Sequence, residues 1–222
     1  GMPRSASTFV WQLTYDLINY NHKQHKLKQL LQPQQRPNFI YDVGQELPSI
    51  MDTIPDHEYY LIKTHGDYHP SFNNYEKNGQ LKIICTIRDP YDLCVSWMDV
   101  HQKEQGMSER RVGFEEADSL DKVTQVVLRD INIAEKWLSS SHSLIFRYSD
   151  ILEDHSQLIK SIVDHIGLEV YLYEKVYKFY QDKRNITEFN VGVQGRGEAF
   201  KKQLSKPIRQ RFDEFIETYL NK

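Results

Sequence analysis

Residues 83–97 read IICTIRDPYDLCVSW, and this stretch contains the step from a strand to a helix that sets the fold class. The run Ile83–Ile87 is short, apolar and rich in β-branched residues, which predicts a buried strand. Asp89 and Pro90 then begin a helical pattern that continues to His101. A strand that leads directly into a helix is the basic unit of α/β proteins.

The same alternation continues on both sides of this unit. Apolar runs of similar length predict further strands at Phe39–Val43, Tyr59–Ile62 and Leu144–Phe146. Helical spacing of apolar residues predicts a helix that begins near Thr8, and others at Leu120–Leu138, Ile151–Ile166, Tyr171–Tyr180 and Ile208–Leu220. We therefore expect one α/β domain over residues 1–222, with a mostly parallel central sheet and helices on both faces. Ligands of such sheets bind beyond the carboxyl ends of the strands.

Composition limits the classes of function. The 222 residues suffice for one domain, and 39% hydrophobic with 27% charged residues is typical of a folded protein. The net charge of −3 provides no overall positive field for nucleic acid or anionic membranes, so any anion site must be built locally. No apolar run approaches the roughly 18–20 residues that span a bilayer, and no signal peptide is recognisable.

The two cysteines, Cys85 and Cys94, lack the spacing of a disulfide framework or a zinc site. We therefore expect reduced thiols in a cytoplasmic protein and no bound metal. Gly1 before Met2 is interpreted as a remnant of an expression vector, with Met2 as the encoded start.

The segment Pro3–Thr8, PRSAST, leads straight into the first predicted helix. Small residues allow backbone amides to curl around an anion, and the N-terminus of a helix adds donors and a favourable dipole. Ser5, Ser7 and Thr8 add hydroxyl donors, and Arg4 adds a planar charged group. The segment predicts a phosphate site, while the alternative is an ordinary helix cap by Ser7 or Thr8. It is not a Walker A loop, because no Gly-Lys-Ser/Thr follows.

Lys63, Thr64 and His65 directly follow the predicted strand Tyr59–Ile62. An unperturbed imidazole titrates near neutral pH, which suits it to remove a proton from a hydroxyl or an amine. A lone histidine is more often structural or solvated, but a place at a strand end beside a lysine favours a catalytic role for His65. His69 lacks such a setting and is interpreted as a surface residue.

Arg88 leaves the predicted strand, and Ser96 lies about two helical turns further on. The two side chains are placed to hold one anion from the strand end and the helix flank. The alternative is an ion pair of Arg88 with Asp89 or Asp92 at the start of the helix, worth less than about 1 kcal/mol if exposed.

Together these segments resemble the sulfotransferase family that depends on 3′-phosphoadenosine 5′-phosphosulfate (PAPS). The family binds the 5′-phosphosulfate with a Pro-Lys/Arg-Ser-Gly-Ser/Thr-Thr loop, which Pro3–Thr8 resembles. It binds the 3′-phosphate with an Arg-(Asp/Asn)-Pro stretch and a serine eight residues after the arginine, which Arg88 and Ser96 match. The trio Lys63–His65 is similar to that of the small-molecule branch, in which the histidine is the base.

A fourth match extends the resemblance over residues 3 to about 150. Arg147-Tyr148-Ser149-Asp150 is similar to the family's Tyr-Glu-Asp segment, whose tyrosine contacts adenine. Phe9 stands where the family has an adenine-stacking aromatic residue. The resemblance implies the P-loop-containing sulfotransferase fold, PAPS as the sulfuryl donor, its product adenosine 3′,5′-bisphosphate (PAP) and no metal.

The resemblance also implies a role for each matched residue. Arg4 would contact the 5′-phosphosulfate and stabilise charge on the leaving oxygen, Lys63 would polarise the sulfuryl group, and His65 would deprotonate a small acceptor. The implied cofactor-binding residues are Arg4, Ser5, Ala6, Ser7, Thr8, Phe9, Arg88, Ser96, Tyr148 and Arg196.

Three features depart from the family pattern. Ala6 replaces the usual loop glycine, so that either position 6 needs no positive φ or the loop is distorted. The C-terminal motif that closes over the 3′-phosphate is matched loosely by Gly192–Lys202, interpreted as a mobile lid led by Arg196 or alternatively as a flexible surface loop. The strand that precedes the loop in the family has no counterpart before Pro3, and we expect a longer reading frame to encode one of about five residues.

Two rival functions and the acceptor class stay open at this point. A kinase of the P-loop class would need the Walker spacing that is absent, while a non-catalytic nucleotide-binding protein on the same fold would fit the loose C-terminal motif. A small-molecule acceptor is favoured over a carbohydrate, because carbohydrate-type members use a carboxylate near the first helix, where only Asp16 stands. We expect no nucleic-acid or membrane partner, and a monomer or weak homodimer.

Overall fold

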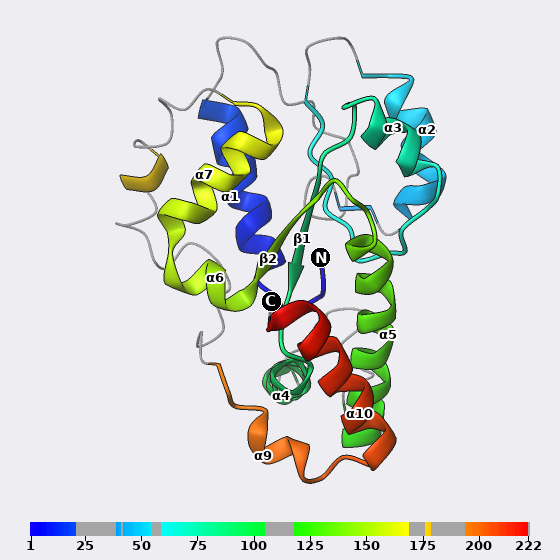
Figure 1. The fold of residues 1–222 in the computed structure, drawn as a ribbon, viewed down its shortest axis with the longest axis vertical. Coiled ribbons are helices and arrows are strands. Elements are labelled where there is room, and N and C mark those ends of the chain that lie inside the picture. Colours follow the sequence, from blue (N-terminus) through cyan, green and yellow to red (C-terminus); the bar gives the residue numbers. More distant parts are fainter. Residues whose placement is uncertain are drawn as a thin grey trace.

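The computed structural model describes residues 1–20, 39–40, 42–54, 59–104, 118–168, 176–178 and 194–221. At its centre two parallel strands lie side by side, β1 (Ile83–Ile87) and β2 (Ser143–Arg147) (Figure 1). Their register pairs Ile83 with Ser143 and Ile87 with Arg147, so both carboxyl ends finish at the same edge. The predicted α/β class, with parallel strands, is thereby confirmed.

Helices cover both faces of this sheet. On one face α1 (Ser7–Tyr20) and α7 (His155–Ile166) pack together, and on the other lies α5 (Leu120–Leu138) (Figure 1). Side chains of β1 alternate between the layers, because successive residues of a strand point to opposite faces. Ile83, Cys85 and Ile87 join the hydrophobic cluster on the α5 side, and Ile84 packs against the cluster formed by α1 and α7.

The helix that follows β1 positions much of the candidate site. It is α4 (Pro90–Glu104), which packs against α5 and leaves the carboxyl end of β1 after a short turn. The Asp89 carboxylate accepts a hydrogen bond from the Tyr91 amide at 2.7 Å and so caps this helix. The other elements are α2 (Val43–Met51), α3 (Phe72–Lys77), α6 (Tyr148–Glu153), α9 (Glu198–Lys201), α10 (Lys206–Phe215) and a π-helical segment (Ile216–Leu220).

Two predicted strands are wrong. Val43 begins α2 instead of ending a strand, because Val43, Leu47 and Ile50 recur at helical spacing and are all buried. Phe39 makes only an isolated parallel bridge to Lys63, and residues 60–62 form no strand. Gly44 and Pro48 hide the helical pattern of α2 in the sequence, since both are poor formers of helix interiors.

One predicted helix is two. Asp154 interrupts the predicted helix Ile151–Ile166 with a non-helical backbone, and its carboxylate accepts hydrogen bonds from the amides of Ser156 and Gln157 at 2.9 and 3.0 Å. The predicted helix Ile208–Leu220 is also divided: α10 ends at Phe215, and the chain continues as a π-helical segment from Ile216 to Leu220. The predicted helix Tyr171–Tyr180 lies largely outside the described residues.

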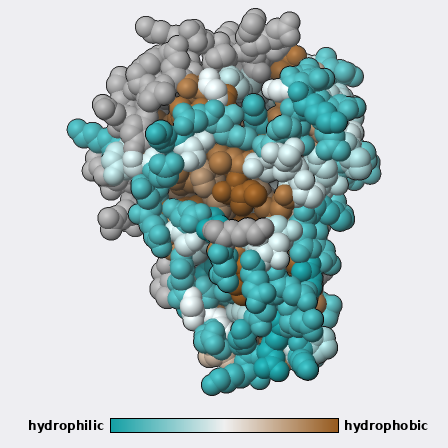
Figure 2. Space-filling model, viewed as in Figure 1, coloured by the Kyte–Doolittle hydropathy of each residue, from teal (hydrophilic) through white to brown (hydrophobic). Residues whose placement is uncertain are grey.

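An apolar cavity of about 490 Å³ lies next to β1. It is lined by residues 80–86, by residues 59–64, and by apolar side chains of α1 and α2 such as Val10 and Leu47. Figure 2 shows a hollow lined by hydrophobic residues in the middle of this face of the molecule. Ser7, Lys63 and Thr64 also line the cavity, so it adjoins the polar residues described below.

Two further predictions concern the state of the cysteines and the presence of membrane-spanning segments. Cys85 and Cys94 are buried and free, as predicted for reduced cysteines. Among the described residues, no helix combines the length and apolar character needed to cross a bilayer.

Candidate functional site

The loop before α1 has an unusual backbone. Arg4 and Ala6 have φ angles of 63° and 64°, in the left-handed region that side chains other than glycine seldom adopt. The prediction that position 6 needs no positive φ is therefore wrong, and the loop keeps the curled shape with alanine in place of glycine. Alternating left-handed residues turn successive amides toward one side, which is the arrangement of anion-binding nests.

Ser5 holds this loop to the sheet. Its hydroxyl is fully buried, donates to the Met2 carbonyl at 2.5 Å and lies 2.7 Å from the Thr86 hydroxyl at the end of β1. The Met2 amide also donates to the Thr86 carbonyl at 2.9 Å. The predicted use of the Ser5 hydroxyl as an anion donor is therefore not supported by this arrangement, because that hydroxyl points inward and anchors the loop.

Lys63 approaches the start of α1 from the neighbouring segment. Its Nζ donates a hydrogen bond to the Thr8 hydroxyl at 2.7 Å. Ser7 and Thr8 form the first turn of α1, where amides have no intrahelical acceptor and the helix dipole is positive. The predicted loop and the predicted lysine therefore lie together, and a cation and a helix N-terminus are available to one anion.

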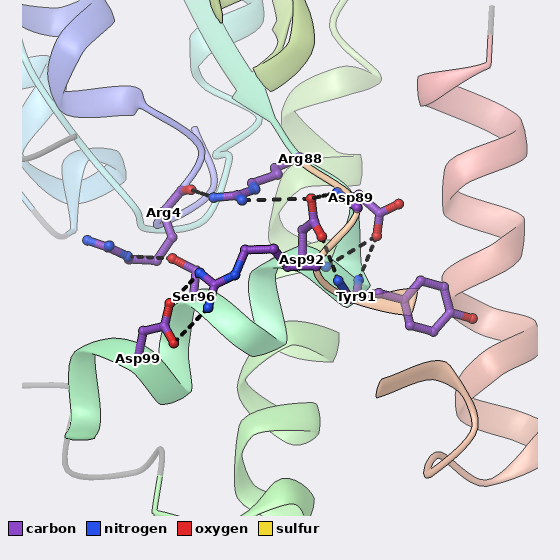
Figure 3. Close-up of polar contacts among 10 residues, drawn as sticks. Arg4, Arg88, Asp89, Tyr91, Asp92, Ser96 and Asp99 are labelled. Atoms are coloured by element: carbon purple, nitrogen blue, oxygen red, sulfur yellow. Dashed lines mark hydrogen bonds and ion pairs between the residues drawn. The ribbon is translucent and has the colours of Figure 1, made fainter. Parts of the chain in front are cut away.

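Arg88 is almost completely buried and contacts three separate parts of the chain. Its Nη1 donates to the Arg4 carbonyl at 3.2 Å, and its Nη2 lies 3.7 Å from the Asp92 carboxylate (Figure 3). Its guanidinium carbon lies 3.9 Å above the ring centroid of Tyr148, within the range of a cation–π interaction. The alternative ion pair of Arg88 with Asp92 is present, and it holds the guanidinium beside the loop.

Arg4 and Ser96 join two of the predicted motifs directly. Nε of Arg4 donates to the Ser96 hydroxyl at 3.1 Å, across 92 residues of sequence (Figure 3). The predicted pairing of Ser96 with Arg88 on one anion becomes a wider arrangement, in which Ser96 contacts the Arg4 side chain and Arg88, just before the start of α4, contacts the Arg4 carbonyl. Both motifs therefore face a common region at the carboxyl end of β1.

A third arginine reaches the same helix from the C-terminal loop. Arg196 makes a bidentate ion pair with Asp99, with N–O distances of 2.5 and 3.1 Å. The backbone amides of Gly195 and Gly197 donate to the Asp92 carboxylate at 3.0 and 2.8 Å. The described part of the predicted lid, residues 194–202, is thus docked on α4, with Arg196 held by a carboxylate.

One face of α4 collects all three arginines. Asp92, Ser96 and Asp99 stand four and three residues apart, which places them on the same side of a helix. They contact Arg88, Arg4 and Arg196 respectively. Sequence reasoning considered Asp92 only as a helix-start partner of Arg88 and missed Asp99, although their seven-residue spacing was a readable signal.

His65 lies at the other end of the site. Its Nδ1 is 2.7 Å from the Gly1 carbonyl oxygen. A carbonyl only accepts, so Nδ1 carries the proton and Nε2 of the neutral ring has a free lone pair. Burial, followed by the positive charges of the Gly1 amino group and Lys63, lowers the pKa of His65 to about 3. The imidazole is therefore neutral at physiological pH, and it is a weaker base than the unperturbed ring on which the sequence prediction was based.

The two residues predicted to contact adenine differ in their surroundings. The Phe9 ring is 6% exposed and packs in the cluster of α1 and α7, with its centroid 5.3 Å from that of His155. Most of the Phe9 side chain is thus covered by other residues. Tyr148 is also buried, beneath the Arg88 guanidinium at the start of α6.

The chemistry of the donors suits a strongly anionic ligand. Guanidinium groups, an ammonium group, hydroxyls and a helix N-terminus match phosphate and sulfate oxygens. Among the residues that the structure describes, no three His, Cys, Asp or Glu side chains gather in the way that a metal ion requires.

A sulfotransferase domain model matches residues 1–222, the whole sequence. The chain belongs to the sulfotransferase family. Among curated proteins, none matches this sulfotransferase. Among solved structures, it is similar to mouse sulfotransferase SULT7A1 complexed with PAP, with a TM-score of 0.57 and 14% identity, over 99% of this chain and 81% of that chain. At this identity the likeness supports the fold, and the predicted sulfotransferase fold and family are both confirmed.

Proposed function

We propose that this sulfotransferase moves a sulfuryl group from PAPS to a hydroxyl or amine of a small acceptor. The observation that carries the proposal is the convergence of Arg4, Arg88 and Arg196 on one face of α4, beside the loop that begins α1. A nucleotide with phosphate groups at two ends of its ribose needs two neighbouring cationic sites, and the hydrogen bond between Arg4 and Ser96 supports the proposal because it joins the loop to α4.

The residues divide between the two ends of the nucleotide. Arg4, the amides of the loop, Thr8 and Lys63 are placed to hold the 5′-phosphosulfate, while Arg88 and Ser96 are placed for the 3′-phosphate. Tyr148 supports the Arg88 guanidinium from below through its ring. Charge-assisted hydrogen bonds from such donors are roughly twice as strong as neutral ones, so they dominate recognition of the nucleotide.

Bound PAPS supplies an activated sulfuryl group on a phosphate leaving group. His65 accepts the acceptor's proton on Nε2, while Nδ1 keeps its hydrogen bond to the Gly1 carbonyl. The acceptor oxygen or nitrogen then forms a bond to sulfur as the bond from sulfur to the bridging oxygen breaks. Arg4 and Lys63 stabilise the negative charge that develops on the bridging oxygen, which leaves with PAP. The sulfur and its three nonbridging oxygens go to the acceptor, and the acceptor's proton stays on His65. The total charge of reactants and products is therefore the same.

Calorimetry with PAP tests the nucleotide site before the acceptor is known. Wild-type protein should bind PAP without Mg²⁺, and Arg88→Ala should weaken binding by about tenfold or more, as expected for a buried charged donor. Arg129→Ala is a matched control, since Arg129 is half-exposed on α5 and pairs with Asp130. Absence of PAP binding by the wild type would refute the proposal.

A second experiment separates catalysis from binding. His65→Ala should lower turnover by about 10²–10⁴-fold, the usual contribution of a general base, and should keep the PAP affinity of the wild type. His69→Ala is the control, because His69 is exposed and its Nδ1 lies 2.8 Å from the hydroxyl of its neighbour Ser71. PAP binding with no sulfuryl transfer to a broad panel of phenols, alcohols and amines would favour the non-catalytic alternative.

A further inference from the structure

Asp92 is the acidic residue that pairs with Arg88, which has just been assigned to the nucleotide, and it is 3% exposed. A carboxylate beside an anion site weakens anion binding through repulsion unless it performs a compensating task. The contacts of Asp92 show such a task. Oδ1 accepts the Gly197 amide at 2.8 Å, and Oδ2 accepts the Gly195 amide at 3.0 Å and faces Arg88 at 3.7 Å.

We propose that Asp92 is a positioning residue, which docks the C-terminal loop 194–197 against Arg88 and thereby completes the nucleotide site. The proposal rests on the proposed function, because the site it completes is the PAP site. Asp92 does not contact the ligand. It links the first turn of α4 with a loop about 100 residues later in the sequence through a single buried carboxylate.

The backbone of the loop is built for this contact. A Cβ added at Gly197 would lie 2.3 Å from the carbonyl carbon of Tyr91 and 2.6 Å from the Asp92 amide nitrogen, so only glycine lets the loop lie this close to α4. Gly195 has a φ of 76°, which turns its amide toward the same carboxylate. Two backbone amides that converge on one carboxylate fix the position of the loop more firmly than a side-chain ion pair does.

Asp99 supplies the contrast. It holds the same loop about two turns further along the same face of α4, through the flexible Arg196 side chain, and both partners are partly exposed. An anion near Ser96 competes with Asp99 for the Arg196 guanidinium. The two carboxylates therefore have opposite consequences: Asp92 assembles the site, whereas Asp99 holds one arginine back from a ligand.

Asp92→Asn tests the proposal through the sign of its effect. Asparagine offers one acceptor oxygen where two amides must be satisfied, so the loop should lose its anchor and PAP affinity should fall by about tenfold or more. If Asp92 were merely a nearby negative charge, its neutralisation would strengthen PAP binding instead. Asp99→Asn removes the same charge from the same helix and should leave PAP affinity unchanged or increase it.

Two further measurements separate positioning from a simple loss of stability. Urea unfolding without PAP gives the stability of each variant, and calorimetry is performed where each is fully folded. Gly197→Ala puts a methyl group between the loop and α4, so it should displace the loop and also weaken PAP binding. Adding Asp92→Asn to this variant should lower the PAP affinity only a little further.

The outcomes are distinct. PAP binding by Asp92→Asn that equals or exceeds that of the wild type would overturn the proposal, as would Gly197→Ala with unchanged affinity if Asp92→Asn fails to fold. Additive losses in the double variant would also overturn it, because they would place the two residues in separate roles. Failure of the wild type to bind PAP would overturn the proposed function itself, and this inference with it.

Discussion

Nε of Arg4 lies 3.1 Å from the hydroxyl oxygen of Ser96, and this hydrogen bond joins the loop before α1 to the flank of α4. Both partners belong to the chain itself, so this contact fixes the two anion-binding segments relative to each other. Preorganised donors lose little conformational freedom when an anion binds, and this raises affinity without any additional contact.

Ser96→Ala should reduce PAP affinity by about tenfold, the equivalent of 1.4 kcal/mol, because it removes both an anion donor and the acceptor that orients Arg4. Isothermal calorimetry measures the change directly. Ser161→Ala on α7 is the control, since the Ser161 hydroxyl accepts a hydrogen bond from Gln157 of the same helix at 3.2 Å. Equal affinities for wild type and Ser96→Ala would show that the contact with Arg4 has no part in binding.

Ala6→Gly should stabilise the protein by about 1 kcal/mol, because Ala6 has a φ of 64° and glycine adopts this conformation without a steric penalty. Urea unfolding monitored by circular dichroism measures the change. Gly167→Ala is the reciprocal control, since Gly167 ends α7 with a φ of 74° and a Cβ there would meet no atom within 4 Å. It should cost a similar free energy, and a destabilised Ala6→Gly variant would contradict the left-handed assignment.

Tyr148→Leu should weaken PAP binding by several-fold, since it removes the ring beneath the Arg88 guanidinium, a contact worth about 0.5–2 kcal/mol. Tyr148→Phe keeps the ring and should retain most of the affinity. Calorimetry on the pair distinguishes the ring face from the phenol group. Should the phenylalanine variant lose as much as the leucine variant, the hydroxyl and not the ring would be the important group.

The pH dependence of stability should report His65. Its pKa is lowered from 6.5 to about 3 in the folded protein, chiefly by burial. Between these two values the unfolded chain binds a proton that the folded protein does not, so stability is complete above about pH 6.5 and falls as the pH drops toward 3.

His65→Asn removes this titration and keeps an N–H donor for the Gly1 carbonyl. Urea unfolding at a series of pH values between 7 and 4 gives the free energy of unfolding as a function of pH. The slope should be shallower for the variant than for the wild type, by an amount that corresponds to at most about one bound proton. Identical slopes for the two proteins would show that His65 titrates normally in the folded state.

The sequence predicted the parts of the fold that local patterns control. Ile83–Ile87 and Leu120–Leu138 match the observed strand and helix, because continuous apolar β-branched residues and an amphipathic stripe are strong signals. Pro3–Thr8, Lys63 and Arg88 lie together as predicted, but only Arg88 follows an observed strand. The loop is instead held to β1 by the Met2 amide and the Ser5 hydroxyl, and the segment with Lys63 forms only an isolated bridge with Phe39 among the described residues.

The remaining features depend on contacts that sequence spacing does not encode. The hydroxyl of Ser5 turns toward β1 because Thr86 offers a buried partner 81 residues away. Arg196 lies on Asp99, and Asp92 accepts two amides from the C-terminal loop, only because tertiary packing brings α9 beside α4. The strand predicted at Phe39–Val43 is wrong although its residue types favour strands. Phe39 forms an isolated bridge, and Val43 begins α2.

The pairing of Ser5 with Thr86 also determines when the site forms as the chain is made. A ribosome releases the loop long before it releases β1, and the parallel partner β2 emerges later still. A contact between residues so distant in sequence forms only after a long loop has closed, which costs conformational entropy and slows folding. The arginine cluster on α4 also needs Arg196, so a nascent chain can complete it only after residues 194–197 have left the ribosome.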